Sequence, residues 1–392
     1  MKKSFLPFYL LLLFSLLFIG CQSTAEEDVA IVETVVPPTE TAVSTTIPTP
    51  VNTFTPRPTA PPPAPPTAIP TTAATNTPLP TETPLATATS TPIPAPWDIL
   101  PWLWHPENAP DPLPAYLPAP VINGSGYLSN FRMIGFYGSL FSRGLGLLGN
   151  QTGRQTMDMM RGVIAEYAPY NHDGRQLIPV IHTIATVAKP CTEDNQCIHR
   201  VEEDWLWEYL AFARNNNAAI VYDIQPGRST MYDEFMRIRP LIADGYPHAH
   251  VALDPEFDMT AEQEPNRQVG TIDAAEINAI QAELQQIAEQ IGVNKVLIIH
   301  QFDHSNGAMI TNKQNIINYP NVELLINGDG YGPPGPKMRN YLKYAGEPGF
   351  EYGGFKMFTD QVDDQLIYDV PFMLPEQVMT ALDPVPVYII FQ

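Results

Sequence analysis

Residues 273–301 read DAAEINAIQAELQQIAEQIGVNKVLIIHQ, and this stretch decides the fold class. Asp273 stands where a helix N-cap is expected, and Glu276 three residues on completes the pattern of a capping box. Apolar residues then recur three or four positions apart, and Gly292 is the residue type that commonly ends a helix. The apolar run 295–301 follows after a short turn and predicts a buried strand. The stretch therefore predicts a helix that leads directly into a strand.

The same alternation continues on both sides of this unit. Apolar runs predict eight strands, at 132–137, 177–183, 218–224, 249–254, 295–301, 322–327, 354–358 and 386–391. Helical patterns separate them, at 154–168, 201–215, 229–243, 273–291, 307–318, 336–345 and 375–381. Strands that alternate with helices indicate βαβ units and a parallel sheet.

Eight such strands within residues 97–392 predict a (β/α)8 barrel of the TIM type, an α/β fold, rather than an open sheet. The eighth strand is not followed by a final helix. We therefore expect the segment 97–120, rich in Trp and Pro, to cover that gap or to close the bottom of the barrel.

The N-terminus has the pattern of a signal peptide. Lys2 and Lys3 precede an apolar stretch at 10–18, and a small residue comes directly before Cys21. Residues 1–21 thus resemble the lipobox of bacterial lipoproteins, which implies cleavage, lipidation of Cys21 and a tether at the cell membrane, outside the cytoplasm. An uncleaved membrane-spanning anchor is the alternative, although the apolar run is short for a span of roughly 20 residues.

Residues 22–96 have the composition of a linker. Between residues 31 and 96 there are 18 prolines and no glycine, and most other residues are Thr, Ala or Val. Such a segment cannot bury enough apolar surface to offset its chain entropy, so we expect a disordered, extended stalk. At about 3.1 Å per residue it could reach roughly 200 Å from the lipid.

The charge balance limits the classes of partner, and the cysteine content bears on the compartment of the protein. Loss of Lys2 and Lys3 would leave 19 of the 21 basic residues against 42 acidic ones, which argues against nucleic acid and anionic lipid headgroups as partners. Cys191 and Cys197 lie in one short polar loop, and in an exported protein such a pair is expected to form a disulfide.

Polar residues follow the predicted strands at the points where the strands end. In a barrel of this kind the functional groups lie at these carboxyl ends. The candidate substrate contacts are Tyr137, His182, Gln225, Arg228, His300, Gln301, Asn327, Asp329 and Lys356. Individually, each could be a loop cap or a structural hydrogen-bonding residue, but together they would converge on one rim.

The strand at 249–254 carries the candidate catalytic carboxyls. Alternation would place Asp254 and Glu256 on one face with Ala252, and Asp223 ends the neighbouring strand. Closely placed carboxylates raise one another's pKa, so that one can donate a proton while another stays ionised. This is what cleavage of a glycosidic bond requires, with Glu256 as the acid and Asp254 or Asp223 as partner.

The pair Asp254-x-Glu256 is similar to the Asp-x-Glu of barrel lysozymes and chitinases, in which the Glu donates the proton. The further aspartates of the chitinase motif are absent, because residues 250–253 read HVAL. The strings DIQPGRS, ALDPEF, HQF and NGDGYGPP also resemble a family of exported bacterial lipoproteins, a resemblance that implies a tethered barrel similar to those of glycoside hydrolases but no particular activity.

The sequence therefore predicts a surface-tethered hydrolase of a cell-wall or environmental glycan that needs no cofactor. Two alternatives remain open. A metal-dependent hydrolase, for example of phosphodiesters, would use ligands drawn from His182, Asp223, Asp254, Glu256 and His300. A non-catalytic lipoprotein that binds a glycan or another solute would use the same polar rim.

Overall fold

Eight parallel strands close into a barrel, in which the sheet order is β1-β11-β10-β9-β7-β5-β4-β2 and β1 also pairs with β2. The strands are β1 (Phe131–Gly138), β2 (Gln176–Ala188), β4 (Ala219–Ile224), β5 (Ala249–Leu253), β7 (Lys295–Gln301), β9 (Val322–Gly328), β10 (Tyr352–Met357) and β11 (Tyr388–Phe391). On the two sides of β1, Phe131 lies opposite Gln176 and Met133 lies opposite Tyr388. The predicted (β/α)8 barrel is confirmed, with its eight strands close to the predicted positions.

The computed structural model describes residues 124–139, 145–149, 153–191, 195–302, 309–345, 347, 349–359 and 369–392. The predicted signal peptide with Cys21, the segment 22–96 and the segment 97–120 lie outside these residues. None of the helices in the described part of the chain is long and apolar enough to cross a membrane.

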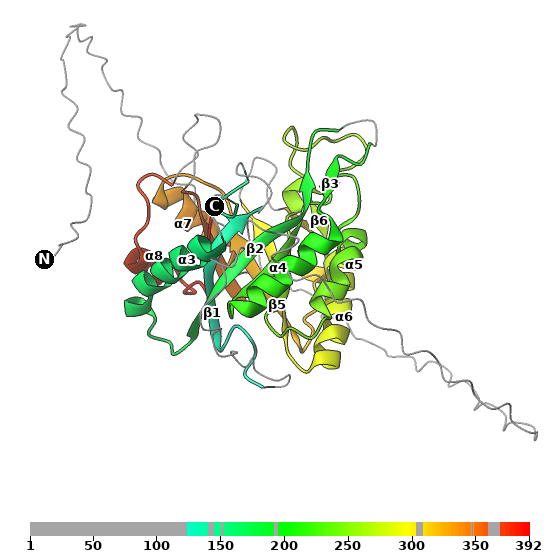
Figure 1. Cartoon of the computed structure of the whole chain (residues 1–392). Coiled ribbons are helices and arrows are strands. Elements are labelled where there is room, and N and C mark those ends of the chain that lie inside the picture. Colours follow the sequence, from blue (N-terminus) through cyan, green and yellow to red (C-terminus); the bar gives the residue numbers. More distant parts are fainter. Residues whose placement is uncertain are drawn as a thin grey trace, which may run out of the picture. The chain divides into compact units, whose positions relative to one another are not determined.

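Six helices in the described ranges surround the barrel (Figure 1): α3 (Gly153–Tyr167), α4 (Glu203–Asn215), α5 (Met231–Ile242), α6 (Ala274–Ile291), α7 (Pro334–Tyr344) and α8 (Pro375–Ala381). Asp273 caps α6 by accepting a hydrogen bond from the Ala275 amide at 2.8 Å, and Gly292 ends α6 in the left-handed conformation. Glu276 does not complete the capping box, because its carboxylate accepts a hydrogen bond from the Tyr232 amide of α5 at 2.9 Å.

The helix predicted at 307–318 is wrong for the described part of that range. The chain there forms a short strand β8 (Ile310–Thr311), which pairs with β6 (Ile272–Asp273), and then a 3₁₀ turn η4 (Lys313–Asn315). Asn312 adopts a left-handed conformation with φ +52°, which interrupts a helix. Side chains of α6 satisfy the backbone instead, since the Gln281 amide donates to the Ile317 carbonyl at 2.9 Å.

Apolar side chains form two layers, as the alternation of the strands requires. Along β5, Ala252 faces the barrel interior, whereas Val251 and Leu253 pack in the layer beneath the helices. At the amino ends of the strands, Tyr127 and Leu128 are buried and their amides donate to the Glu323 carboxylate of β9. Residues just after the segment 97–120 thus help to close the bottom of the barrel.

An arm extends from the carboxyl end of β2. The end of β2 pairs antiparallel with β3 (Ile198–Arg200), and Cys191 and Cys197 in the connecting turn are joined by a disulfide with a Cα–Cα distance of 4.2 Å. The disulfide therefore closes a β-hairpin arm, in agreement with the sequence-based expectation.

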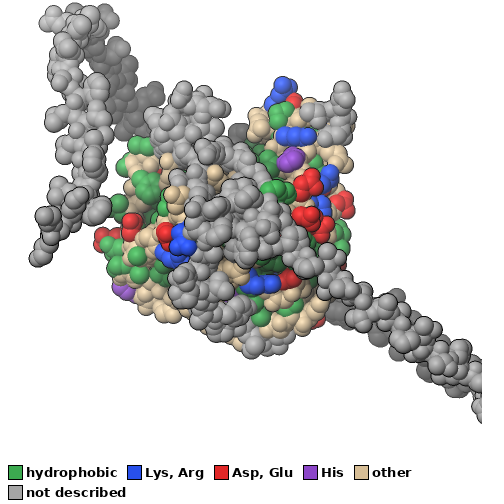
Figure 2. All heavy atoms as spheres, in the orientation of Figure 1, with side chains coloured by type: hydrophobic (Ala, Val, Ile, Leu, Met, Phe, Trp, Pro, Cys, Tyr) green, Lys and Arg blue, Asp and Glu red, His purple; other side chains and the backbone are tan. Residues whose placement is uncertain are grey.

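On the face shown in Figure 2, the described basic side chains are scattered among acidic and uncharged ones rather than gathered in a patch.

Candidate active site

Polar side chains from the barrel strands converge at the carboxyl ends of those strands, in the barrel interior. Tyr137 of β1 pairs in register with His182 of β2, and His300 of β7 pairs with Asn327 of β9. These four side chains and Asp223 of β4 are almost fully buried. The structure thus brings together predicted site residues that are far apart in the sequence.

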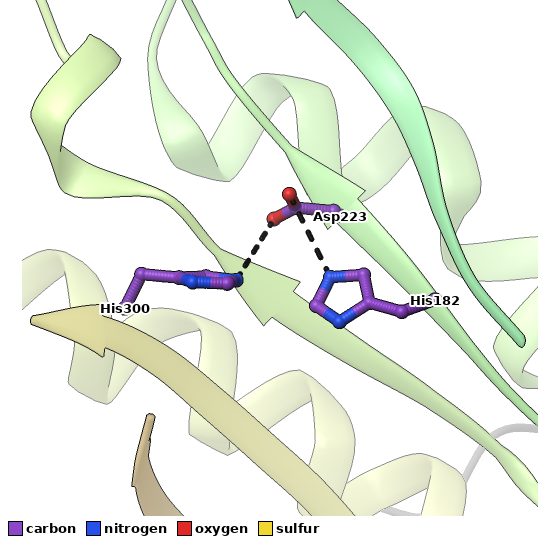
Figure 3. A group of neighbouring side chains, drawn as sticks. All are labelled: His182, Asp223 and His300. Carbon is purple, nitrogen blue, oxygen red and sulfur yellow. Dashed lines mark ion pairs between the residues drawn. The ribbon is translucent and has the colours of Figure 1, made fainter. Parts of the chain in front are cut away.

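Asp223 lies at the centre of this cluster (Figure 3). The Tyr137 hydroxyl donates a hydrogen bond to its Oδ2 at 2.8 Å. The Nε2 atom of His182 lies 3.6 Å from Oδ2, and the Nε2 atom of His300 lies 3.8 Å from Oδ1. Burial favours the neutral form of Asp223, but His300 and His182 outweigh it and hold the pKa of the carboxyl below its ordinary value.

A second carboxylate, Asp329, lies just after β9. Its Oδ2 accepts hydrogen bonds from His300 Nδ1 and from Lys356 Nζ, both at 2.9 Å. Burial opposes ionisation of Asp329, yet the Lys356 ammonium and His300 hold its pKa well below the usual range. Lys356 Nζ also lies 4.0 Å from the centroid of the Tyr137 ring. Lys356 therefore contacts both Asp329 and the tyrosine that hydrogen-bonds to Asp223.

Glu256 is placed by a turn and not by strand alternation, whereas Asp254 directly follows β5 and its amide still donates to the Ile224 carbonyl of β4 at 3.0 Å. Strand β5 ends at Leu253, and Glu256 lies in the 3₁₀ turn η3 (Pro255–Phe257). The alternation argument for a shared face therefore does not extend to Glu256. Both carboxyls nevertheless sense the negative charges of Asp223 and Asp329.

The environments of these carboxyls drive their pKa values apart. Burial, and then the charge of Asp329, raises the pKa of Glu256 to about 7. Burial and the charge of Glu256 raise the pKa of Asp254 well above its usual range. Ionised and protonated carboxyls therefore stand together in one cluster near neutral pH, an arrangement suited to acid–base chemistry.

Two of the predicted contacts serve loop structure instead. The Arg228 guanidinium donates to the Gln263 carbonyl at 2.9 Å and contacts Asn195, so it holds two loops together. The Gln301 side chain accepts a hydrogen bond from the Met309 amide at 3.1 Å. A third, Gln225, supports the cluster from behind by donating to the Tyr137 hydroxyl at 3.1 Å.

Aromatic side chains near the rim differ in their availability. Tyr331 is 63% exposed and its ring centroid lies 6.0 Å from that of Phe358. Trp205, by contrast, packs against the apolar layer under α4. Tyr331 is therefore the better placed of the two for a ligand ring, and Phe257 in η3 is partly exposed.

The sequence analysis missed two residues of the site. Tyr388 begins β11, and its hydroxyl lies 2.5 Å from His182 Nδ1. Lys337 of α7 donates to the backbone carbonyl of Lys356 at 2.8 Å and pairs with Asp369 at 3.1 Å. Neither stands at the carboxyl end of a strand, which is where polar residues were sought.

One group within the cluster has the composition of a metal site. Ligand atoms of His182, Asp223 and His300 all lie within 4.8 Å of one another.

No protein-family model matches the chain, and a search of curated proteins finds no match. The function is therefore inferred from the geometry of this cluster.

Proposed function

We propose that this protein is an extracytoplasmic hydrolase of glycosidic bonds, in which Glu256 donates the proton to the leaving-group oxygen. The observation that carries the proposal is the convergence of Glu256 with the buried Asp254, Asp223 and Asp329 at the carboxyl ends of the strands, where burial and the charge of Asp329 raise the pKa of Glu256 to about 7. A carboxyl with this pKa can still be protonated near neutral pH and can give its proton to a departing sugar oxygen. The lipidated Cys21 and the stalk would tether the barrel at the outer side of the membrane.

The cluster would supply the remaining groups that the reaction needs. The ionised Asp223 would act as electrostatic partner to the positive charge that develops on the sugar, with Asp254 beside Glu256. Lys356, Asn327 and Tyr137 would contact sugar hydroxyls, and the exposed ring of Tyr331 would stack on a sugar face at the rim. The substrate class is a cell-wall or environmental polysaccharide.

The test compares Glu256→Gln with Asp258→Asn on the full-length protein. Burial and the charge of Glu276 raise the pKa of Asp258 to about 7, so Asp258 is a matched carboxyl whose charged neighbour lies outside the cluster. We expect Glu256→Gln to lower turnover of a glycan by roughly 10²- to 10⁴-fold, the range for one general acid, and Asp258→Asn to change it little.

A second substrate makes the test specific for proton donation. In an aryl glycoside of a strongly acidic phenol, the phenolate can depart without being protonated. Glu256→Gln should therefore retain far more activity on this substrate than on the natural linkage. Equal losses on both substrates would contradict the role of Glu256 as acid. Glycan binding without any turnover would instead favour the alternative of a non-catalytic binding lipoprotein.

A further inference from the structure

We infer that His182, Asp223 and His300 form a binding site for one divalent transition-metal ion, with zinc as the favoured ion. The three side chains come from β2, β4 and β7 and point toward one another in the barrel interior (Figure 3). All three are fully buried. The inference concerns binding and does not depend on which bond the protein hydrolyses.

The first support is that the facing atoms lack other partners. His182 Nε2, His300 Nε2 and Asp223 Oδ1 are buried and have no hydrogen-bond partner among the described residues. Buried polar atoms are nearly always satisfied, and three unsatisfied ones that converge are unusual. Two imidazole nitrogens and one carboxylate oxygen form a ligand set that zinc and iron(II) accept.

The distances fit a site that closes slightly around an ion. His182 Nε2 lies 3.6 Å from Asp223 Oδ2, and His300 Nε2 lies 3.8 Å from Asp223 Oδ1. Ligand atoms at about 2.1 Å from a tetrahedral zinc ion would be roughly 3.4 Å apart. One ligand atom from each residue lies within 4.8 Å of the other two, so side-chain rotations that shorten these separations would bring the three atoms to bonding distance and leave a fourth position open for water or substrate.

The second support comes from the groups behind the two imidazoles. His300 donates from Nδ1 to Asp329 at 2.9 Å, which leaves its Nε2 lone pair directed at Asp223. His182 Nδ1 is held by the Tyr388 hydroxyl at 2.5 Å, so its Nε2 also faces Asp223. A ligating histidine typically uses its other nitrogen in this way, and a carboxylate is a common partner.

Charge balance gives the third support. Asp223 is fully buried, and the one hydrogen bond that its carboxylate accepts from the described residues comes from Tyr137. The Lys356 ammonium hydrogen-bonds to Asp329 instead. A buried carboxylate needs compensating charge, and because ligating histidines must be neutral, a cation between the two imidazoles would supply that charge. Such an ion would polarise a bound water, and Asp223 would then act as a ligand.

The test measures metal content and affinity in full-length protein purified without a histidine tag. After dialysis against zinc, we expect elemental analysis to find one zinc per chain. Titration calorimetry on chelator-treated protein should show that His182→Gln, His300→Gln and Asp223→Asn each weaken zinc binding by more than the 10- to 100-fold typical of a change behind the ligands. Asp329→Asn should weaken it within that range.

The control is His199→Gln, because His199 is exposed on β3 and lies outside the cluster. This variant should bind zinc as the wild type does. If a ligand variant fails to fold, the wild-type protein still decides the question, because zinc should raise its melting temperature and cobalt(II) should give the intense visible bands of a four-coordinate ion. Zinc content far below one per chain, or binding unchanged in His300→Gln, would overturn the inference.

Discussion

Glu256 and Asp258 are two residues apart, and burial raises the pKa of both carboxyls to about 7. Their neighbours differ, however. The strongest charged neighbour of Glu256 is Asp329 in the cluster, whereas that of Asp258 is Glu276 of α6. Similar pKa values at these two positions thus arise from different surroundings. A comparison of the Glu256 and Asp258 variants can therefore distinguish a catalytic carboxyl from a structural one.

The raised pKa of Glu256 also predicts how stability depends on pH. The carboxyl titrates at about 7 in the folded protein against an ordinary value of 4.5, so the folded state binds this proton more tightly than the unfolded chain does. The stability that this provides is fully present below pH 4.5 and is lost as pH rises through about 7. Glu256→Gln should therefore be the more stable form at pH 8.

The size of this effect follows from the shift. The full shift corresponds to about 3 kcal/mol, and because the side chain is partly exposed we expect about 2 kcal/mol. Denaturant unfolding of metal-free protein at pH 4 and pH 8 measures it: the two forms should unfold alike at pH 4 and differ at pH 8. An equal difference in unfolding free energy at both pH values would argue against a raised pKa of Glu256 in the folded protein.

At the scale of single residues, the sequence predicted which residues lie in the site better than it predicted what each of them does. Asp223, His182 and His300 were identified because polar residues directly after apolar runs stand out. Arg228 and Gln301 share that signal but bind loop backbone, a distinction that depends on loop conformation. Tyr388 carried no signal, since an aromatic residue at the start of a strand is indistinguishable from core.

At the scale of elements, the strands were predictable because each contains an apolar run and helical patterns separate most of these runs. The range 307–318 was predicted as a helix, but contacts with α6 decide the structure of its described part. The β2–β3 arm was not predicted as a hairpin. A disulfide and a short strand with one buried residue give little periodic signal.

Gly354 of β10 explains how Tyr388 fits inside the barrel. A Cβ atom there would lie 2.8 Å from Leu325 Cδ2, 3.0 Å from Asn327 Oδ1 and 3.1 Å from Tyr388 Cδ1. We expect Gly354→Ala to cost about 1 to 3 kcal/mol through overpacking and to displace Tyr388 from His182. Denaturant unfolding measures the loss of stability.

The matched control for this substitution is Gly162→Ala. Gly162 lies within α3, and a Cβ atom there would meet nothing within 4 Å. Alanine should stabilise this helix position by about 0.5 to 1 kcal/mol. If Gly354→Ala behaved like Gly162→Ala, the close packing of Tyr388 in the barrel interior would be wrong.

At the scale of the whole molecule, the closed barrel buries one apolar layer inside the strands and a second beneath the helices. In the described residues, η4 stands where a helix between β7 and β9 would be, and it contacts α6. The barrel bottom is closed in part by Tyr127 and Leu128. In the described part of the chain, the packing at the barrel bottom therefore begins with Tyr127 and Leu128.

We accordingly expect a chain that starts at Trp97 to unfold at the same temperature as one that starts at Gln22. The segment between them has no core-forming pattern, so its removal should leave the heat of unfolding unchanged as well. Differential scanning calorimetry of the two chains measures both quantities. A clear fall in melting temperature would show that the segment packs against the barrel.

The pairing of β1 with β11 has a consequence for the time course of synthesis. Strands emerge in sequence order, so β1 has only β2 beside it until β11 arrives, and the growing sheet keeps two open edges. Tyr388, which holds His182, follows it by 206 residues. A partly synthesised chain therefore carries the polar side chains of the cluster without Tyr388, and His182 gains this partner only after β11 has been synthesised.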